Sequence, residues 1–502
     1  MRGKPITLRL AQALLLALFA VNVYRAASQS ITCDEACTYN EFLAGSPWQL
    51  VRSYEASHHV LYTALAKLSI SVLGLSEFTL RIPALLGGLL YLITACRLCL
   101  YLFGEGLFFL LAFAGLSLNP YLLDFLSVAR GYGLALGLCL WALYHLLRYV
   151  DARVADAPLA GLAHLHKAAV GLALSVAANL TLLLPCAALA FLLLIILAAD
   201  ALLAGGRLTM ARQLAHAADH FLAPGVLIAV LLLALPLSRA HPDPFFLGMQ
   251  TLRASLQDLL SAALVTHSSA WLDFKRFESA IWQAGRMVVP LVLLLIAGTL
   301  LAILRRWRRA RDFRSLDRGD RFLWFCGGAM LVSLAGLMAA HYAFGVPHPV
   351  GRSGLYFLPL FLLACSTLLA RLSGRPAARW AGPLVLSLML IQFLLRFDVT
   401  HYADWSEDAA TRSMVSTIRA HQALHPQGKV RVGATWELAP GLNFYRQLYK
   451  LDWMEPVARE GPKAPCDYFV LFQRDAALLD KLRLTVLHQD ARFGVLLAAP
   501  QR

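Results

Sequence analysis

The sequence predicts an all-α membrane protein with many transmembrane helices, followed by a small α/β domain at its C-terminal end. Of the 502 residues, 59% are hydrophobic and only 15% are charged, and the mean hydropathy is +0.61. Soluble domains are about 45–50% apolar. Apolar runs such as 8–23 and 170–203 reach the ~17–25 residues that cross a bilayer. In the last hundred residues or so, these runs shorten and polar residues increase.

About eleven transmembrane helices fit the apolar pattern, and a count of about ten to thirteen is compatible with it. They are expected at residues 8–24, 80–100, 106–118, 122–147, 168–181, 183–203, 220–237, 287–304, 321–343, 354–371 and 380–396. The segment 106–118 is short, and Pro185 is expected to separate the fifth helix from the sixth, because proline interrupts a helix.

Basic residues set the orientation of these helices. They cluster near the N-terminus (Arg2, Lys4, Arg9) and within 305–321 and 371–379. An odd number of helices that starts inside places all three clusters in the cytoplasm, as the positive-inside rule requires. The formal net charge of +15 is therefore explained by topology, and nucleic-acid binding is not expected.

Chemistry is then expected on the outer face of a bacterial inner membrane, with the active site and the C-terminus in the periplasm. The outer segments are 25–79, 119–123, 238–286, 344–353 and everything after 396. We expect a transmembrane catalytic domain over 1–396, with outer loops 25–79 and 238–286, and a soluble periplasmic domain over 397–502. Strands are expected at 430–434, 468–472 and 495–497. The apolar stretch 61–74 is too short to cross and predicts an interfacial or re-entrant helix.

Two adjacent acids, Asp34 and Glu35, are the first acidic residues of the chain and follow the first expected helix by about ten residues. On these residues alone, a helix start is the simpler interpretation, because acids favour a helix N-terminus. Three further blocks change that weighting. Residues 58–62 read HHVLY, residues 74–88 read GLSEFTLRIPALLGG, and residues 119–132 read NPYLLDFLSVARGY.

Together these blocks resemble the GT-C superfamily of membrane glycosyltransferases, near the family 39 protein mannosyltransferases and the aminoarabinose-transferase-like members. Those proteins show an outer Asp-Glu pair, a His-Pro-Pro-Leu-Tyr segment, a Gly-x-Ser-Glu-x-x-x-Arg-x-Pro segment and an Asn-Pro…Glu-Ala-Arg-Pro-Tyr segment. Here His59 and Val60 replace the two prolines, and Val128 replaces the last acid. Asp124 precedes Val128 by one helical turn, so it either presents a carboxylate to a similar place or pairs with an arginine at the membrane rim.

The resemblance implies a sugar donor carried on a polyprenyl phosphate, and catalytic roles for Asp34 and Glu35. Asp34 is the expected general base, and direct displacement would invert the anomeric centre. Glu35 either orients the acceptor or begins the following helix. The remaining candidates for substrate positioning are Asp124, His59, Tyr62 and Tyr132.

Three basic residues are candidates to bind the donor phosphate. Arg130 lies 18 residues before Arg148, about 27 Å along a helix and so close to one membrane thickness. It either binds phosphate bidentately or extends its charge to the membrane surface. His58 matches a family position where a basic residue meets the phosphate, or it is an interfacial contact. Arg352 resembles the Arg-Tyr before a late helix, or it anchors the membrane edge.

No cofactor is expected. A divalent metal is possible but is not indicated by the spacing of Cys and His residues. Cys33 and Cys37 flank the acidic pair on the oxidising side, but a separation of four in a helix directs their side chains poorly for a disulfide. The expected partners are the lipid-linked donor, membrane lipids, and an acceptor that is a glycan, a lipid or a protein.

Two other classes of protein remain open. A transporter or flippase for lipid-linked sugars would also span the membrane many times, but it predicts inverted repeats and charges at mid-membrane depth. A non-enzymatic assembly protein would leave the Asp-Glu pair without a role. The sequence does not name the sugar, the acceptor or the oligomeric state.

Overall fold

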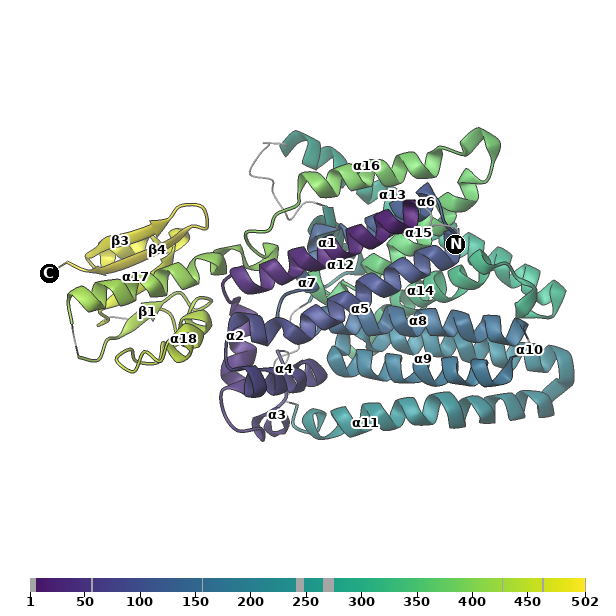
Figure 1. The fold of residues 1–502 in the computed structure, drawn as a ribbon, viewed down its shortest axis with the longest axis horizontal. Coiled ribbons are helices and arrows are strands. Elements are labelled where there is room, and N and C mark those ends of the chain that lie inside the picture. Colours follow the sequence, from purple (N-terminus) through teal and green to yellow (C-terminus); the bar gives the residue numbers. More distant parts are fainter. Residues whose placement is uncertain are drawn as a thin grey trace.

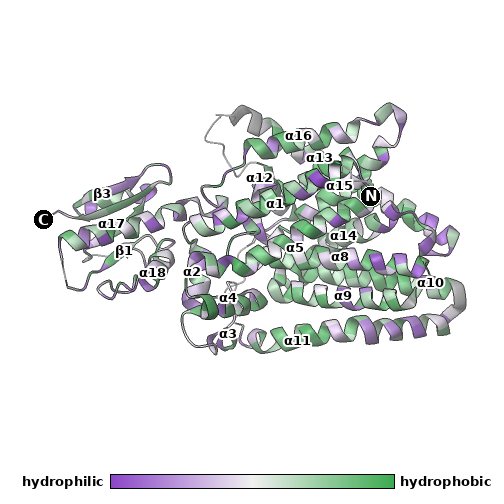
Figure 2. Cartoon of the chain, viewed as in Figure 1, coloured by the Kyte–Doolittle hydropathy of each residue, from purple (hydrophilic) through white to green (hydrophobic). Residues whose placement is uncertain are grey.

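The computed structural model describes residues 6–501, apart from 56, 156, 241–247, 265–274, 427 and 463–464. Within these residues, nine helices are long and apolar enough to cross a membrane. They lie side by side as a bundle, and a small sheet domain stands at one end of it (Figure 1). Apolar residues dominate the bundle helices, whereas polar residues gather at their ends and in the C-terminal domain (Figure 2). The predicted fold class is confirmed.

Five of the nine spans are α1 (Ile6–Ser28), α5 (Glu77–Phe103), α8 (Tyr132–Val154) and α14 (Arg318–Phe344), together with most of α9 (Pro158–Ala178). Most of α13 (Lys275–Ala310) forms another, and α16 (Ala381–Leu395) forms one together with the turn before it, over Pro376–Leu395. Helix α10 (Leu183–Ala217) is bent at Gly206, so its first part belongs to the span Leu180–Leu203 and its last part joins α11 (Ala223–Leu237) in the span Gly206–Leu237. Two expected spans are shorter helices: α6 (Leu107–Ser117) has 11 residues and is too short for a full crossing, whereas α15 (Phe357–Ser373) has 17 residues and is at the lower limit of a crossing length. The expected helix over 122–147 is wrong at its start, because the short helix α7 (Pro120–Phe125) ends before α8 begins.

Close backbone contacts at glycines explain where α8 begins. A Cβ atom on Gly131 would lie 2.0 Å from the carbonyl oxygen of Ala178, at the end of α9. Farther along, a Cβ on Gly137 would lie 2.5 Å from the carbonyl oxygen of Gly87 in α5. Small residues let membrane helices approach closely. The segment between α7 and α8 is therefore held tightly against α5 and α9, and it carries Arg130.

Short elements cover the end of the bundle that faces the C-terminal domain (Figure 1). The main ones are α2 (Cys33–Thr38), η1 (Tyr39–Leu43), α3 (Gln49–Arg52), α4 (Val60–Leu73), α7, α12 (Leu252–Leu264), η6 (Gly351–Gly354) and η8 (Ala403–Ala410). Single-turn elements elsewhere are η2 (Leu180–Leu182), η3 (Ala218–Leu222), η5 (Phe313–Ser315), η7 (Pro376–Ala378) and η9 (Gln473–Asp475). Helix α4 has 14 residues, about 21 Å of length, and so is too short to cross the membrane, as its sequence predicts.

The C-terminal domain contains a four-stranded sheet of order β1-β2-β4-β3. Its elements are β1 (Val432–Ala434), β2 (Tyr468–Phe472), β3 (Leu484–Asp490) and β4 (Val495–Pro500), with helices α17 (Thr411–Leu424), α18 (Ala439–Leu448) and α19 (Ala477–Lys481). Strands β1 and β2 are parallel, and the other pairs are antiparallel. The sequence predicts β1, β2 and β4 but misses β3. Most β3 side chains, including Val486 and Leu487, are exposed at the sheet edge.

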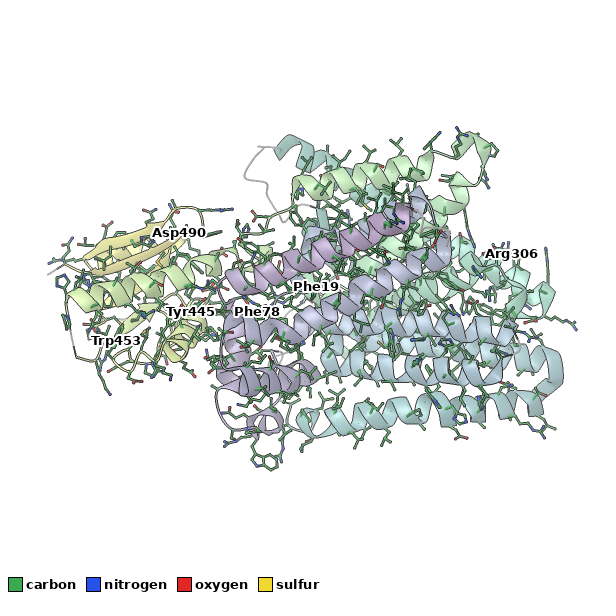
Figure 3. The ribbon with its side chains drawn as sticks, in the orientation of Figure 1. Phe19, Phe78, Arg306, Tyr445, Trp453 and Asp490 are labelled. Carbon is green, nitrogen blue, oxygen red and sulfur yellow. The ribbon has the colours of Figure 1, made fainter. Side chains whose placement is uncertain are left out.

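Polar contacts fasten this domain to the bundle. The Arg412 guanidinium in α17 lies 2.8 Å from the Glu77 carboxylate at the start of α5. The backbone N–H of Ile31 donates to the hydroxyl of Tyr445 in α18, at 3.0 Å. Tyr445 and Phe78, which follows Glu77, lie on either side of this junction (Figure 3). The outer domain is therefore docked directly on the elements that surround α2.

Two of the predicted cytoplasmic clusters meet at the opposite end of the bundle. Arg306 lies 2.8 Å from Asp320, and Arg371 pairs with the same carboxylate. Arg306 lies far from Trp453 and Asp490 of the C-terminal domain (Figure 3). Arg2 and Lys4 of the third cluster lie outside the described residues. The arrangement agrees with the proposed topology, in which the arginine-rich end faces the cytoplasm.

Cysteine labelling tests this orientation. Single Arg309→Cys and Gln489→Cys variants, in a background where Cys466 is replaced by Ser, place one exposed thiol at each end of the molecule. An impermeant maleimide added to spheroplasts should label the variant at position 489 and spare the variant at 309, because we expect the basic end to face the cytoplasm. Permeabilised cells should label both. Labelling at position 309 in sealed spheroplasts would show that the orientation is the reverse of the expected one.

Candidate active site

The sequence blocks converge on the buried carboxylate of Glu35. Arg81 in α5 donates two hydrogen bonds to it, from Nε to Oε1 at 2.8 Å and from Nη2 to Oε2 at 2.6 Å. The backbone N–H of Thr32 donates to Oε2 at 2.8 Å, and the N–H of Ala129 donates to Oε1. Thr32 in turn caps the start of α2. Glu35 thus begins the helix, as one of its two predicted roles required, and does not line the cavity described next.

Asp34 points the other way, into a cavity of about 770 Å³ at the outer end of the bundle. His58 and His59 of the 58–62 block line it, as do Arg130 and Tyr132 of the 119–132 block and Arg352, whereas no residue of the 74–88 block does. The side chain of Asp34 retains 25% of its exposure, and its Oδ2 lies 2.5 Å from Nη2 of Arg352. The structure therefore brings the expected base and the expected phosphate ligands to one cavity.

Arg130 is buried beside α2. Its Nη1 donates to the hydroxyl of Thr38 at 2.8 Å and to the carbonyl oxygens of Ser57 and Asp34 at 3.2 and 3.3 Å. Its Nε has no hydrogen-bond partner among the described residues. Among the same residues, no carboxylate forms an ion pair with the Arg130 guanidinium. The guanidinium is thus positioned by neutral oxygens and keeps its full charge for an anionic ligand.

The two histidines line the same wall. His58 is 2% exposed, stacks on Phe42 with ring centroids 4.3 Å apart, and finds no hydrogen-bond partner for either ring nitrogen within the described residues. Burial lowers the pKa of His58 to about 4, so this side chain is neutral at pH 7. His59 packs edge-on against Tyr132, 5.2 Å between centroids.

Two predicted substrate-positioning residues lie elsewhere. Asp124 is buried and pairs with Arg25 of α1, and its Oδ2 accepts a hydrogen bond from the N–H of Ala403 at 2.8 Å. Tyr62 is also buried and donates its hydroxyl to the carbonyl oxygen of Leu80 at 2.6 Å. Neither residue lines the cavity. Of the two predicted roles of Asp124, the structure therefore shows the pairing with an arginine, which is Arg25 of α1.

Several cavity residues escape the sequence analysis. The acids among them are Glu41, Glu55, Asp258 and Asp404, and the others include Tyr54, Asn179 and Arg459. Burial raises the pKa of Asp404 to about 6, although Arg352 opposes the effect. These residues come from segments without a recognisable motif. The one signal for Asp404 is its position in a polar stretch shortly after the last apolar run.

The described residues contain no group of three or more His, Cys, Asp or Glu side chains placed to hold a metal ion. Cys33 and Cys37 are both free thiols, and both are buried. A hydrogen bond between them raises the pKa of the Cys33 thiol and lowers that of Cys37. Cys37 lines the cavity.

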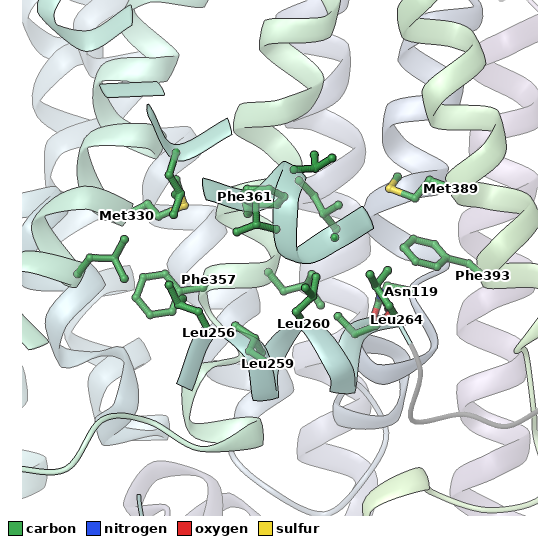
Figure 4. Close-up of a pocket in the computed structure, with 18 residues that line it drawn as sticks. Asn119, Leu256, Leu259, Leu260, Leu264, Met330, Phe357, Phe361, Met389 and Phe393 are labelled. Atoms are coloured by element: carbon green, nitrogen blue, oxygen red, sulfur yellow. Dashed lines mark hydrogen bonds between the residues drawn. The ribbon is translucent and has the colours of Figure 1, made fainter. Parts of the chain in front are cut away.

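A second, apolar cavity of about 230 Å³ lies among α12, α13, α14, α15 and α16. Leu256, Leu260, Met330, Phe361 and Phe393 are among its lining residues (Figure 4). Helix α12 contributes to both cavities, since its leucines line the apolar one and its Asp258 lines the polar one. A polar cavity and an apolar cavity thus share one helix as their wall.

No family model matches the chain, and no curated protein matches it. Similar solved structures include ArnT from Cupriavidus metallidurans bound to undecaprenyl phosphate, at 14% identity and a TM-score of 0.43, covering 98% of this chain and 97% of that one. The oligosaccharyltransferase AglB from Archaeoglobus fulgidus matches at 11% identity and a TM-score of 0.47, covering 92% and 69%. The arabinosyltransferase EmbB from Mycobacterium smegmatis matches at 13% and 0.34, covering 89% and 44%. At these identities and TM-scores, the likeness does not extend to individual site residues.

The contacts of Glu35 predict a loss of stability when its charge is removed. Glu35→Gln leaves the buried Arg81 without its counter-charge, and breaking such a pair costs about 3–5 kcal/mol. We expect a lower midpoint of thermal unfolding in detergent, followed by intrinsic fluorescence. Asp34→Asn is the matched control, because Asp34 lies half-buried at the cavity wall and should change the midpoint little. Equal midpoints for the two variants would show that Glu35 does not anchor α2.

Proposed function

We propose that the protein is an inverting glycosyltransferase of the bacterial inner membrane, which moves a sugar from a polyprenyl-phosphate donor to an acceptor hydroxyl at the periplasmic face. The observation that carries this proposal is that one cavity contains both a carboxylate and hydrogen-bond donors that suit a phosphate. Asp34 offers a carboxylate, while Arg130 and His58 offer buried nitrogen atoms that have no partner among the described residues. Buried polar groups are rarely left unsatisfied, so these nitrogens favour a ligand with acceptor oxygens.

A phosphate ester of a sugar fits both sides of the cavity. Arg130 and Arg352 bind the phosphate oxygens and stabilise the negative charge that grows as the sugar–phosphate bond breaks. His58 adds a neutral hydrogen bond. Asp34 accepts the proton of the acceptor hydroxyl as the new glycosidic bond forms. The hydroxyl oxygen attacks from the side opposite the leaving phosphate, and the anomeric configuration therefore inverts. The lipid phosphate leaves with both electrons of the broken bond.

The apolar cavity fits the lipid part of such a donor. Its position on the other face of α12 places a hydrocarbon site next to the phosphate site. A hydrocarbon chain that enters this cavity from the bilayer is held by packing contacts, because lipid tails are as apolar as the cavity lining. The two cavities together therefore suit an amphipathic donor with a charged head and an apolar chain.

A transfer assay tests the proposed function. Purified protein is incubated with a panel of labelled undecaprenyl-phosphate sugars and with membrane extract, and the labelled product is identified. We expect one donor to give a glycosylated acceptor without added nucleotide. Movement of intact labelled lipid across vesicles, without any new glycoside, would instead identify a transporter.

Asp34 carries the sharpest expectation. Asn is nearly isosteric with Asp but cannot accept the proton, and a positioned base typically contributes about 10²–10⁴-fold. Turnover of Asp34→Asn should therefore fall at least about a hundredfold, with donor binding largely intact. The control is Glu407→Gln, which alters a carboxylate outside the cavity. Normal transfer by a folded Asp34→Asn protein would reject Asp34 as the base.

Arg130 should discriminate between two replacements. Lysine keeps the charge but loses the planar, bidentate guanidinium, whereas alanine loses both. Arg130→Ala should therefore weaken kcat/KM for the donor more than Arg130→Lys. The loss for alanine should reach roughly 2–4 kcal/mol, as for other groups that stabilise developing charge. If both variants transferred sugar at rates close to wild type, Arg130 would be only a membrane anchor.

A further inference from the structure

The guanidinium of Arg352 lies between two carboxylates from distant parts of the chain. Its Nη2 is 2.5 Å from Oδ2 of Asp34, and its Nη1 is 3.7 Å from Oδ2 of Asp404. The ring of Trp405 lies against the same guanidinium, 5.0 Å from the ring centroid to Cζ. One cation is thus shared by α2, which carries Asp34, and by η8, which carries Asp404.

Helix η8 is anchored to the elements that build the site. At its start, the N–H of Ala403 donates to Oδ2 of Asp124 in α7. Near its end, Oδ2 of Asp408 accepts a hydrogen bond from the N–H of Cys33 at 2.5 Å. Trp405 packs on Phe125 of α7, with centroids 5.8 Å apart. Asp404 is therefore held in register with Asp34, although it belongs to the segment that leads into the outer domain.

The contact between Arg352 and Asp34 conflicts with the roles proposed for these two residues. Nη2 of Arg352 donates to Oδ2 of Asp34 and so occupies an oxygen that would accept the proton. The same arginine cannot bind the donor phosphate fully while it remains on Asp34. Both requirements are met if Arg352 leaves Asp34 when the donor enters, and a second carboxylate keeps the guanidinium in the cavity during that change.

We propose that Asp404 is a positioning residue for the transfer reaction, which holds Nη1 of Arg352 while Nη2 moves from Asp34 to the donor phosphate. The inference rests on the proposed function and adds a residue to its site. Tyr121 of α7 orients Asp404, since its hydroxyl donates to Oδ2 at 3.4 Å. Asp404 touches neither sugar nor phosphate and acts through Arg352.

The charge of Asp404 should also set a pH dependence. Burial is the main cause that raises the pKa of Asp404 to about 6, and the nearby charges of Asp124 and of Asp34 in α2 raise it as well. The charge of Arg352 in η6 and the hydrogen bond from Tyr121 act in the opposite direction and lower this pKa. Asp404 is therefore ionised above about pH 6 and loses its hold on Arg352 below it. The wild-type rate should fall on the acid side with a midpoint near pH 6, and Asp404→Asn should remove that step.

A double-mutant cycle tests the proposal with the full-length protein. Values of kcat and donor KM are measured for wild type, Asp404→Asn, Arg352→Gln and the double variant. Asp404→Asn should lower kcat about tenfold with little change in KM, a size typical of coupled neighbours. The double variant should be no slower than Arg352→Gln alone, because Asp404 has no effect without its arginine. Glu407→Gln, on the same helix, is the control and should match wild type.

Three results would overturn the proposal. They are additive losses in the cycle, a wild-type kcat for Asp404→Asn, or an acid limb that is unchanged in that variant. If Asp404→Asn does not fold, Asp404→Glu replaces it, and it should keep both the acid limb and the coupling to Arg352. Failure of the inference is separable from failure of the proposed function. In the first case wild type transfers sugar and Asp34→Asn does not, while in the second wild type itself transfers none.

Discussion

The buried ion pair between Glu35 and Arg81 is the constraint on which the outer end of the bundle depends. Arg81 also donates to the carbonyl oxygens of Ala26, Gln29 and Ser30, so one guanidinium fixes the turn that joins α1 to α2. The other oxygen contacts of Glu35 reach the backbone of Thr32 and Ala129. A buried charge without its partner costs several kcal/mol. The pair therefore fixes the relative positions of three segments and, with them, the direction in which Asp34 points.

Neighbouring acids consequently divide two tasks. In the first turn of α2, successive side chains point about 100° apart, so Glu35 faces the interior while Asp34 faces the cavity. Asp124 repeats the structural task on α7, where it joins Arg25 to the start of η8. The result is a cavity in which Asp34 and Arg352 contact each other and are surrounded by charged groups with fixed partners. Such preorganisation is what stabilises developing charge without reorganisation during a reaction.

Sequence patterns predicted the fold well, because apolar runs and basic clusters report directly on membrane crossing. They failed where backbone approach decides the structure. The break before α8 depends on contacts of Gly131 and Gly137 with α9 and α5, which no local pattern encodes. The edge strand β3 was missed, and in the structure it is defined by its pairing with β4.

For the site, motif order correctly placed Asp34, His58 and Arg130 in one cavity. Sequence alone could not separate the tasks of Asp34 and Glu35, since both fit a helix start and both carry the same charge. Asp404 could not be predicted as a site residue, because it lies 52 residues from Arg352 in the sequence and only the tertiary structure brings the two together. The neutral state of His58 likewise follows from burial against Phe42, and burial of a single loop residue cannot be inferred from its neighbours in sequence.

The proposed function requires the cavity beside Asp34 to bind the phosphate of a lipid-linked donor. A structure of the protein determined with bound undecaprenyl phosphate would show where that phosphate lies. We expect density for the phosphate between the guanidinium groups of Arg130 and Arg352, with Arg352 moved off Asp34 and the lipid chain running toward the apolar cavity beyond α12. Phosphate bound elsewhere, with the Arg352–Asp34 contact intact, would contradict it.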